Sequence, residues 1–293
     1  MTATSLIPEL VAAGPVLTDG AWGTELQARG LAAGEIGDIW NLSHPDRVEA
    51  VARAYVDAGS RIILTNTFRA NRIALLRYAG GERVADVNRA GVEIARRAAA
   101  GRALVFASIG PSGKLLATRE IDVQSLEAAF TEQARALADA GADGLVVETM
   151  ADLSEAKIAV EAALATGLSV VACMVFDSGK SRDRTMMGVS PKQAAVELTG
   201  AGAHVIGANC GIGVEAAVPI CEALASATDR PIWIKPNAGL PELVDRRIVY
   251  RMHPETFAGF LPRLTAAGAR FIGGCCGTSP RFVEALRQRL ACR

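Results

Sequence analysis

Short apolar runs alternate with longer amphipathic stretches along the whole chain. The runs are rich in Val, Ile and Leu and show little of the polar and apolar alternation of a half-exposed strand. Continuous apolar runs of this kind are typical of strands that are buried on both faces, as in parallel sheets. The sequence predicts such strands at residues 16–19, 61–66, 104–108, 144–149, 170–176, 205–210, 232–235 and 270–274.

The stretches between the predicted strands carry apolar residues at helical spacing. Pairs such as Ala267-Gly268 stand where helices would end, because glycine suits the position after the last turn. Pro191, Pro254 and Pro280 stand where helices would begin, because proline suits the first turn. The sequence predicts helices at residues 49–58, 84–99, 126–140, 154–165, 191–198, 214–227, 254–267 and 280–290.

Eight alternating strand and helix units in 293 residues predict an α/β protein of the (β/α)8, or TIM, barrel class. The alternative is an open doubly wound sheet, which usually has fewer strands and a Gly-x-Gly-x-x-Gly phosphate fingerprint. No such fingerprint follows the first predicted strand, so the barrel is favoured. No linker-like tract divides the chain, and we expect one barrel domain over residues 1–293.

The composition is that of a soluble globular protein, with 50% apolar and 21% charged residues. The 31 Lys and Arg residues balance the 31 Asp and Glu residues, which leaves no net field to attract nucleic acid or an anionic membrane. No apolar run approaches the roughly 20 residues that span a bilayer, and the first residues do not resemble a signal peptide. We therefore expect a cytoplasmic protein with reduced cysteines and with no nucleic-acid or membrane partner.

Polar residues and glycines follow nearly every predicted strand. Active sites of (β/α)8 barrels lie at the C-terminal ends of the strands, so these residues would meet at one mouth. Packing alone does not explain polar residues at the ends of otherwise apolar strands. The residues are Asp19-Gly20, Thr65-Asn66-Thr67, Ser108-Ile109-Gly110-Pro111, Glu148-Thr149, Asn209-Cys210, Pro236-Asn237-Ala238-Gly239 and Cys275-Cys276.

Three cysteines stand out among these residues because glycines flank them. Adjacent side chains in a regular strand point to opposite faces, so Cys275 and Cys276 can serve one site only where the backbone turns. The neighbouring glycines allow such a turn. Cys210, Cys275 and Cys276 therefore predict a Zn2+ site with three thiolate ligands and an open fourth position. That pattern is typical of catalytic rather than structural zinc.

Two other interpretations of the adjacent cysteines are buried small hydrophobic residues and a strained disulfide. The remaining cysteines, Cys173, Cys221 and Cys292, look ordinary: one lies in a strand, one on a helix and one at the terminus. Zinc with three thiolates is a weak Lewis acid for hydrolysis, but it can bind an incoming thiol and hold it as a thiolate. We therefore expect a sulfur nucleophile that attacks an alkyl group.

Other residues at the predicted mouth are candidates for substrate contacts. The carboxylates of Asp19 and Glu148 could bind the ammonium of an amino acid, or they could form a turn and a helix N-terminus. Gly20 could offer its backbone N–H to a carboxylate or form a plain turn. The amide oxygen of Asn237 could fill the open metal position before substrate arrives, or Asn237 could be a turn residue. Lys235 either serves an anionic group or is a solvated charge at the rim.

Together these segments resemble the homocysteine S-methyltransferase family. The resemblance implies a (β/α)8 barrel in which Cys210, Cys275 and Cys276 hold zinc and homocysteine binds the zinc through its sulfur. It also implies that the amino group of homocysteine lies near Asp19 and Glu148. The matching segments are Asp19-Gly20-Ala21-Trp22-Gly23-Thr24, Thr65-Asn66-Thr67-Phe68, Ile109-Gly110-Pro111-Ser112-Gly113, Glu148-Thr149, Asn209-Cys210, Pro236-Asn237-Ala238-Gly239 and Gly273-Gly274-Cys275-Cys276-Gly277-Thr278.

The resemblance is greatest to the homocysteine-binding module of cobalamin-dependent methionine synthases. Asn237 matches an asparagine that looks like a displaceable fourth ligand there, and we assign Gly20 and Asn209 of the matching segments to the substrate pocket. The methionine synthase modules for folate and cobalamin are missing from this chain. We therefore expect a methyl-corrinoid (methylcobalamin) carried by a separate protein as the methyl donor.

Other donors remain alternatives. Family members that use betaine have a tyrosine after the strand-four glutamate and a long C-terminal arm, whereas Thr149 follows Glu148 here and the chain stops soon after the last predicted helix. Users of S-methylmethionine tend to carry arginine after the cysteine pair, where this chain has Gly277. S-methylmethionine or S-adenosylmethionine therefore ranks second as donor, and betaine third.

Two further hypotheses assign other functions to the chain. The glycine-rich ends of the last two strands could hold a phosphate, with the adjacent cysteines incidental. Alternatively, the barrel could bind zinc or respond to oxidation without catalysis. Neither hypothesis needs Asp19, Glu148 and Asn237 at one mouth. The residues leave open whether the acceptor is homocysteine or a related thiol or selenol, and they predict no oligomeric state.

Overall fold

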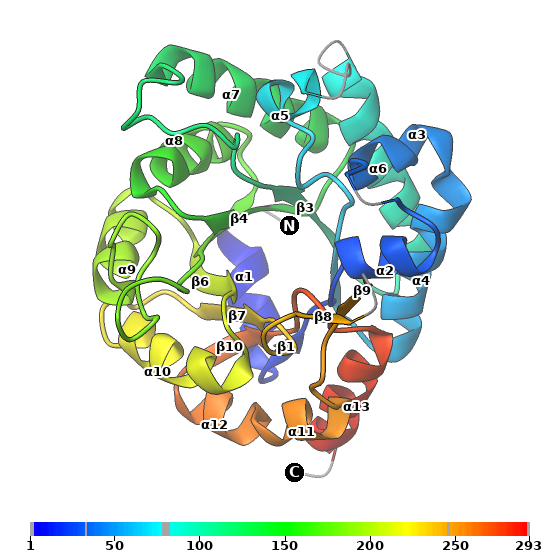
Figure 1. Cartoon of the computed structure of the whole chain (residues 1–293), viewed down its shortest axis with the longest axis vertical. Helices are drawn as coiled ribbons and strands as arrows, with labels where there is room; N and C mark the ends of the chain where they lie inside the picture. Colours follow the sequence, from blue (N-terminus) through cyan, green and yellow to red (C-terminus); the bar gives the residue numbers. More distant parts are fainter. Residues whose placement is uncertain (1–2, 33, 78–82, 245–246, 292–293) are drawn as a thin grey trace.

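Eight parallel strands form a ring in the computed structural model, which describes residues 3–32, 34–77, 83–244 and 247–291. Their hydrogen-bonded order is β1-β10-β7-β6-β5-β4-β3-β2, and a parallel bridge between Thr18 and Ile62 joins β1 to β2. Each strand overlaps one predicted strand, so the predicted (β/α)8 barrel is confirmed (Figure 1). The strands are β1 (Val16–Leu17), β2 (Ile62–Leu64), β3 (Leu104–Ile109), β4 (Gly144–Met150), β5 (Ser169–Met174), β6 (Val205–Cys210), β7 (Ile232–Pro236) and β10 (Ala269–Ile272).

Helices surround the ring of strands, and each predicted helix is present (Figure 1). The stretch predicted as one helix at 254–267 forms two. Pro262 has no N–H to donate to the carbonyl four residues earlier, and α12 begins with this proline in its first turn. The outer helices are α4 (Pro45–Ala58), α6 (Val84–Ala99), α7 (Val123–Asp139), α8 (Leu153–Leu164), α9 (Pro191–Gly200), α10 (Val214–Ala225), α11 (Pro254–Gly259), α12 (Leu261–Ala266) and α13 (Pro280–Ala291).

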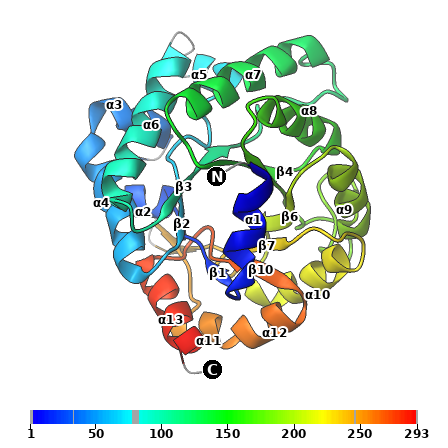
Figure 2. The same cartoon turned by 180° about the vertical axis from the view of Figure 1, so that it is seen from behind.

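Several short elements lie outside the predicted pattern. Figure 2 shows α1 across one end of the barrel, and Figure 1 shows the β8–β9 hairpin on the opposite side. Leu6, Ile7 and Leu10 of α1 are buried against the side chains that point into the barrel, so α1 closes its N-terminal end. The additional elements are α1 (Ala3–Ala12), α2 (Gly23–Ala28), η1 (Gly37–Ile39), α3 (Trp40–Ser43), α5 (Arg72–Leu76), β8 (Glu242–Val244) and β9 (Arg247–Val249).

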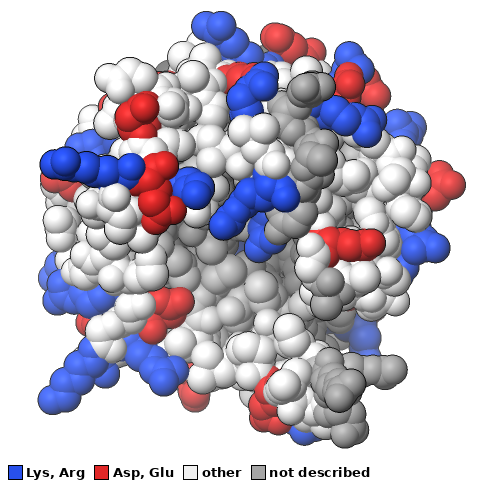
Figure 3. All heavy atoms as spheres, turned by 45° about the horizontal axis from the view of Figure 1, so that its top comes forward, with Lys and Arg blue, Asp and Glu red and all other residues white. Residues whose placement is uncertain are grey.

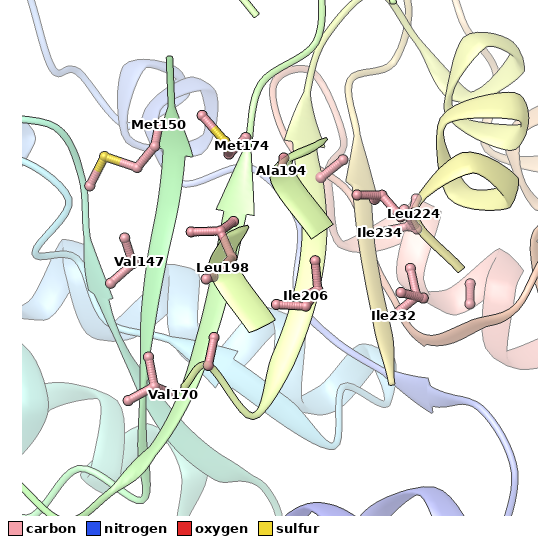
Figure 4. Close-up of a cluster of buried hydrophobic side chains, with 14 of the residues drawn as sticks. Val147, Met150, Val170, Met174, Ala194, Leu198, Ile206, Leu224, Ile232 and Ile234 are labelled. Carbon is pink, nitrogen blue, oxygen red and sulfur yellow. The ribbon is translucent and has the colours of Figure 1, made fainter. Parts of the chain in front are cut away.

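Side chains of the strands alternate between the inside of the barrel and the surrounding helices. Inside, the rings of Phe106, Trp233 and Phe271 lie next to one another, with centroids 6.3 and 5.2 Å apart. Outside, apolar side chains of β4 to β7 pack against α9 and α10, as Figure 4 shows for Ala194 and Leu198 of α9. The same alternation directs every second residue at the strand ends into the mouth of the barrel.

The large Trp233 fits inside the barrel because its neighbour on β6 is a glycine. Gly207 pairs in register with Trp233. A Cβ atom on Gly207 would lie 2.3 Å from the Trp233 carbonyl oxygen and 2.7 Å from Cys173 Sγ. Both distances are shorter than van der Waals contact, so the barrel interior has no room for a side chain at this position.

We expect Gly207→Ala to lower the free energy of unfolding by about 1–3 kcal/mol, the usual cost of overpacking a core. Gly200→Ala is the matched control, because Gly200 is the last residue of α9 and nothing lies within 4 Å of an added Cβ. Alanine should leave stability there unchanged or raise it by up to about 1 kcal/mol. Urea unfolding of both variants measures the difference, and equal effects would contradict this account of the interior.

The surface carries interspersed charges of both signs. On the face shown in Figure 3, basic and acidic side chains alternate without a broad patch of one sign. Exposed ion pairs such as Lys157–Glu197, at 2.9 Å, add little stability because water screens them. Among the helices described, none is both long and apolar enough to cross a membrane.

Candidate functional site

The three predicted cysteine sulfurs lie together at the C-terminal mouth of the barrel. Cys210 ends β6, Cys275 and Cys276 follow β10, and β7 lies between these two strands. The Sγ atoms of Cys210 and Cys275 are 3.0 Å apart, and all three Sγ atoms lie within 4.8 Å of one another. Within the described ranges, these residues make up the one group of three or more His, Cys, Asp or Glu side chains that could hold a metal ion.

The backbone turns inward at both strand ends to bring the sulfurs together. Cys210 has a φ of 61°, a left-handed conformation that is uncommon outside glycine. The Cys275 N–H donates to the Pro236 carbonyl oxygen at 2.9 Å, which holds the second turn against the end of β7. Gly277 has a φ of 80°, and a Cβ there would lie 2.2 Å from the Tyr250 ring. Glycine is therefore needed next to the cysteine pair, as the sequence indicates.

The cluster has the geometry and charge of a metal site. Zn–S bonds of about 2.3 Å would place tetrahedral sulfur ligands about 3.8 Å apart, so these sulfurs need only small shifts to fit. Hydrogen bonds from the thiols of Cys210 and Cys275 lower the pKa of Cys276. A sulfur that favours its thiolate form suits a bound cation, which would displace the protons of the other thiols. The assignment of the three residues as zinc ligands stays a prediction.

Two other cysteines have packing roles, as the sequence suggests. Cys173 lies in the barrel interior, and Cys221 of α10 is buried with its thiol donating to the Ala267 carbonyl at 3.5 Å. Burial raises the pKa of both thiols, so both stay protonated at neutral pH. Cys292 lies outside the described residues.

Asn237 ties the two cysteine-bearing loops to each other. Its Nδ2 donates to the Gly211 carbonyl at 2.7 Å, and its Oδ1 accepts from the Cys276 N–H at 2.9 Å. The side chain therefore holds the loop after β6 against the loop after β10. Its predicted role as a displaceable fourth metal ligand stays a prediction, because the amide oxygen faces a backbone N–H in this conformation.

Asn209 connects the sulfur cluster to the end of β4. Its Oδ1 accepts from the Thr149 N–H at 2.7 Å, and its Nδ2 donates to Thr149 Oγ1 at 2.6 Å and to Glu148 Oε2 at 3.3 Å. The same Nδ2 lies 3.9 Å from the sulfurs of Cys210 and Cys275. Thr149 has a φ of 59°, which is strained for a β-branched residue, and Asn209 supplies the hydrogen bonds that hold it.

Asp19 and Lys235 form an ion pair inside the barrel. Lys235 Nζ contacts Asp19 Oδ1, and the two side chains are 2% and 0% exposed. Asp19 Oδ2 accepts from the Leu64 N–H at 2.8 Å and from Trp22 Nε1 at 2.9 Å. Burial lowers the pKa of Lys235, but the carboxylates of Asp19 and Glu148 raise it by more, so the amine is charged. Lys235 is therefore not a solvated rim charge, and the pairing with Asp19 was missed at the sequence level.

Glu148 is a buried carboxyl group at the same level of the barrel. Its Oε1 accepts from Ser108 Oγ at 2.5 Å. Burial raises its pKa to about 7, although the nearby Lys235 ammonium opposes the shift. A small change in the surroundings, such as an arriving ammonium group, is enough to ionise this carboxyl group at neutral pH.

A cavity of about 330 Å3 lies between the sulfurs and α2. Its inner end includes the three cysteines with Lys235 and Glu148, whereas Asp19 is not among its lining residues. The predicted site residue Gly20 lines it too, and a Cβ there would lie 2.4 Å from the Thr278 carbonyl oxygen. Apolar and aromatic side chains line it as well, among them Trp22, Leu26, Leu31 and Phe68.

Comparison with known proteins shows the family of the chain. The chain matches the family described as Homocysteine S-methyltransferase over residues 16–290. It is 30% identical to the methionine synthase of Mycobacterium leprae over 302 residues, which cover 97% of this chain and 25% of that protein. It is also 30% identical to the Mycobacterium tuberculosis methionine synthase over 292 residues, with 93% and 24% covered. The chain thus spans about a quarter of the length of these relatives.

A solved structure of similar length shares the fold. The metallated form of the homocysteine methyltransferase MmuM from Escherichia coli matches with a TM-score of 0.78 at 27% identity, and the match covers 94% of this chain and 96% of that one. Fold and site together define a (β/α)8 barrel with a cysteine cluster at its mouth. The chain belongs to the homocysteine S-methyltransferase family.

We expect Glu148 to make the metal-free protein less stable as the pH rises from 5 to 8. Its folded-state pKa of about 7 lies above the ordinary value of 4.5, so between these values the folded protein binds a proton that the unfolded chain has released. The free energy of unfolding therefore falls with rising pH, by about 2.5 kcal/mol from this group. Urea unfolding of the wild type and of Glu148→Gln at both pH values measures the effect.

The variant should lose this part of the pH dependence. Glu161→Gln, on the exposed face of α8, is the control and should behave like the wild type. If all three proteins show the same change between pH 5 and pH 8, burial does not perturb the Glu148 carboxyl group as described.

Proposed function

We propose that the chain transfers a methyl group to the thiol of homocysteine, giving methionine, at a zinc ion held by Cys210, Cys275 and Cys276. The observation that carries the proposal is the convergence of three sulfurs at the inner end of a cavity that also contains a buried carboxyl group. Family membership and the likeness to methionine synthases and to a homocysteine methyltransferase support the choice of reaction.

Three sulfur ligands suit the handling of a thiol substrate. When bound, Zn2+ would supply a fourth coordination position that lowers the pKa of an incoming thiol and keeps it as a thiolate at neutral pH. Cys210, Cys275 and Cys276 would hold the ion, and Asn237 would keep the two loops in register through its hydrogen bonds. A donor set of thiolates keeps the substrate sulfur electron-rich and therefore nucleophilic.

The residues beside the cluster would orient the substrate. Glu148 would accept the ammonium of homocysteine, with Ser108 and Asn209 fixing the direction of its two oxygens. The cavity would exclude water from the substrate sulfur. That thiolate would attack the donor methyl carbon in line, so that the sulfur–carbon bond forms as the methyl–donor bond breaks, and the demethylated donor would leave with the electron pair of that bond. Because the substrate is held at both ends, little orientational freedom remains to be lost in the transition state.

The methyl donor we propose is a methyl-corrinoid carried by a separate protein. The likeness to methionine synthases supports this choice, as do Thr149 after Glu148 and Gly277 after the cysteine pair. S-methylmethionine or S-adenosylmethionine is the second candidate and betaine the third. We further propose that residues 1–293 act as one domain and work in the cytoplasm, where the cysteines stay reduced.

We expect zinc-loaded protein to form methionine from homocysteine and methylcobalamin, and to form less with S-methylmethionine, S-adenosylmethionine or betaine. Mass spectrometry of the product measures each rate. Cys276→Ala should reduce the rate by more than about 100-fold, because loss of an outer-shell partner of a metal ligand alone costs 10- to 100-fold. An unchanged rate in this variant would rule out the proposed mechanism, and another preferred donor would overturn the corrinoid assignment.

We expect the purified protein to bind one zinc ion per chain, and Cys276→Ala to bind it at least about 10-fold more weakly. Cys221→Ala is the matched control, because Cys221 lies on α10 and is buried against the end of α12, away from the cluster. Titration with a zinc chelator measures the affinity of each protein. Equal loss of zinc from both variants would contradict the ligand assignment, whereas zinc binding without any homocysteine binding would favour a non-catalytic zinc protein.

A further inference from the structure

Lys235 is the charged group that β7 presents to the cavity. It lines the cavity together with Glu148 and the cysteines, whereas its ion-pair partner Asp19 does not. A lysine that is 2% exposed and still borders a cavity can reach a ligand without leaving its own partner. Lys235 therefore brings a positive charge to the cavity, as the first of its two sequence interpretations requires.

Asp19 has little capacity left for a substrate. Its Oδ2 already accepts from the Leu64 N–H at 2.8 Å and from Trp22 Nε1 at 2.9 Å, and its Oδ1 contacts Lys235. The negative charge of Asp19 is thus matched by the Lys235 ammonium. Glu148 lines the cavity and each of its oxygens accepts one hydrogen bond, so it is the carboxyl partner within reach of a substrate ammonium.

Glu148 and Lys235 therefore offer two opposite charges to one ligand. An α-amino acid carries an ammonium and a carboxylate on the same carbon atom, and this pair of side chains complements both. We propose that Lys235 binds the α-carboxylate of the thiol substrate, with Asp19 as the positioning residue that holds the lysine in place. The inference rests on the proposed function and adds the residue that recognises the carboxylate of the substrate.

The inference can be tested with homocysteine and two thiols that each lack one charged group. 3-Aminopropane-1-thiol lacks the carboxylate, and 4-sulfanylbutanoate lacks the amino group. Isothermal titration of zinc-loaded protein at pH 8 with each thiol gives the dissociation constants. A charge-assisted hydrogen bond corresponds to a preference of roughly 10- to 100-fold, so the wild type should bind homocysteine that much more tightly than either analogue.

Lys235→Gln should reduce the preference for homocysteine over 3-aminopropane-1-thiol to within about 3-fold of unity, because the carboxylate then has no cation to bind. The preference over 4-sulfanylbutanoate should remain. Glu148→Gln should show the reverse pattern. Lys157→Gln, which removes an exposed lysine of α8, is the matched control and should keep both preferences.

A second variant covers the case in which Lys235→Gln does not fold. Removing one partner of a buried ion pair leaves an unpaired charge, whereas Asp19→Asn combined with Lys235→Gln removes both charges. The double variant should lose the same preference. Unchanged ratios in the two Lys235 variants would overturn the inference and leave the proposed function intact.

Two other outcomes would also overturn it. Arg69 lines the same cavity beside Phe68. If Arg69→Gln, rather than the Lys235 variants, removes the preference for the carboxylate, Arg69 is the carboxylate partner. If wild-type protein binds none of the three thiols, the proposed function fails and the inference fails with it.

Discussion

The site depends on one geometric constraint: two strands that are not neighbours must deliver sulfurs to the same point. β6 and β10 lie on either side of β7, and because adjacent strands are about 4.8 Å apart, their backbones are separated by about 10 Å. Pro236 at the end of β7 contacts the ends of both strands. It pairs in register with Cys210 on one side, and its carbonyl oxygen accepts from the Cys275 N–H on the other. Because the strands end at the same level, short inward turns can close the remaining gap between the sulfurs.

The charged residues at the mouth order the side chains of the site more than they stabilise the fold. Buried ion pairs rarely stabilise a fold by much, since the loss of hydration offsets the attraction. In this barrel every carboxyl oxygen of Asp19 and Glu148 has a partner. Asp19 contacts Lys235, Trp22 and a backbone N–H. Glu148 accepts from Ser108 and Asn209. Such a fully satisfied network fixes side chains in one arrangement. An ordered arrangement of charges next to a cysteine cluster is what selective binding of a small charged thiol requires.

The sequence predicts the barrel well because buried parallel strands produce unmistakable apolar runs. It also predicts that the cysteines converge, because glycines such as Gly277 mark the turns that the cluster needs. The sequence analysis missed helix α1, which closes the N-terminal end of the barrel. Its apolar residues pack against side chains from distant strands, and the local sequence does not show that contact. The pairing of Lys235 with Asp19 joins residues 216 positions apart, and nothing in the local sequence specifies that distance. Alternation along β7, which places Trp233 and then Lys235 inside, is the one signal that could have found it.

Strain at the mouth supports the proposed catalytic role of the cluster. Thr149 and Cys210 both have left-handed backbone conformations, at φ values of 59° and 61°, which cost stability in residues other than glycine. Asn209 holds Thr149 by accepting from its N–H and donating to its Oγ1, and the same amide Nδ2 also donates to Glu148 and lies 3.9 Å from the sulfurs of Cys210 and Cys275. A protein that merely stores zinc could use four ligands on relaxed turns and would need neither the buried carboxyl group nor the cavity. Strain is retained here where it aligns the carboxyl group with the sulfurs, and that alignment is useful only if one molecule contacts both.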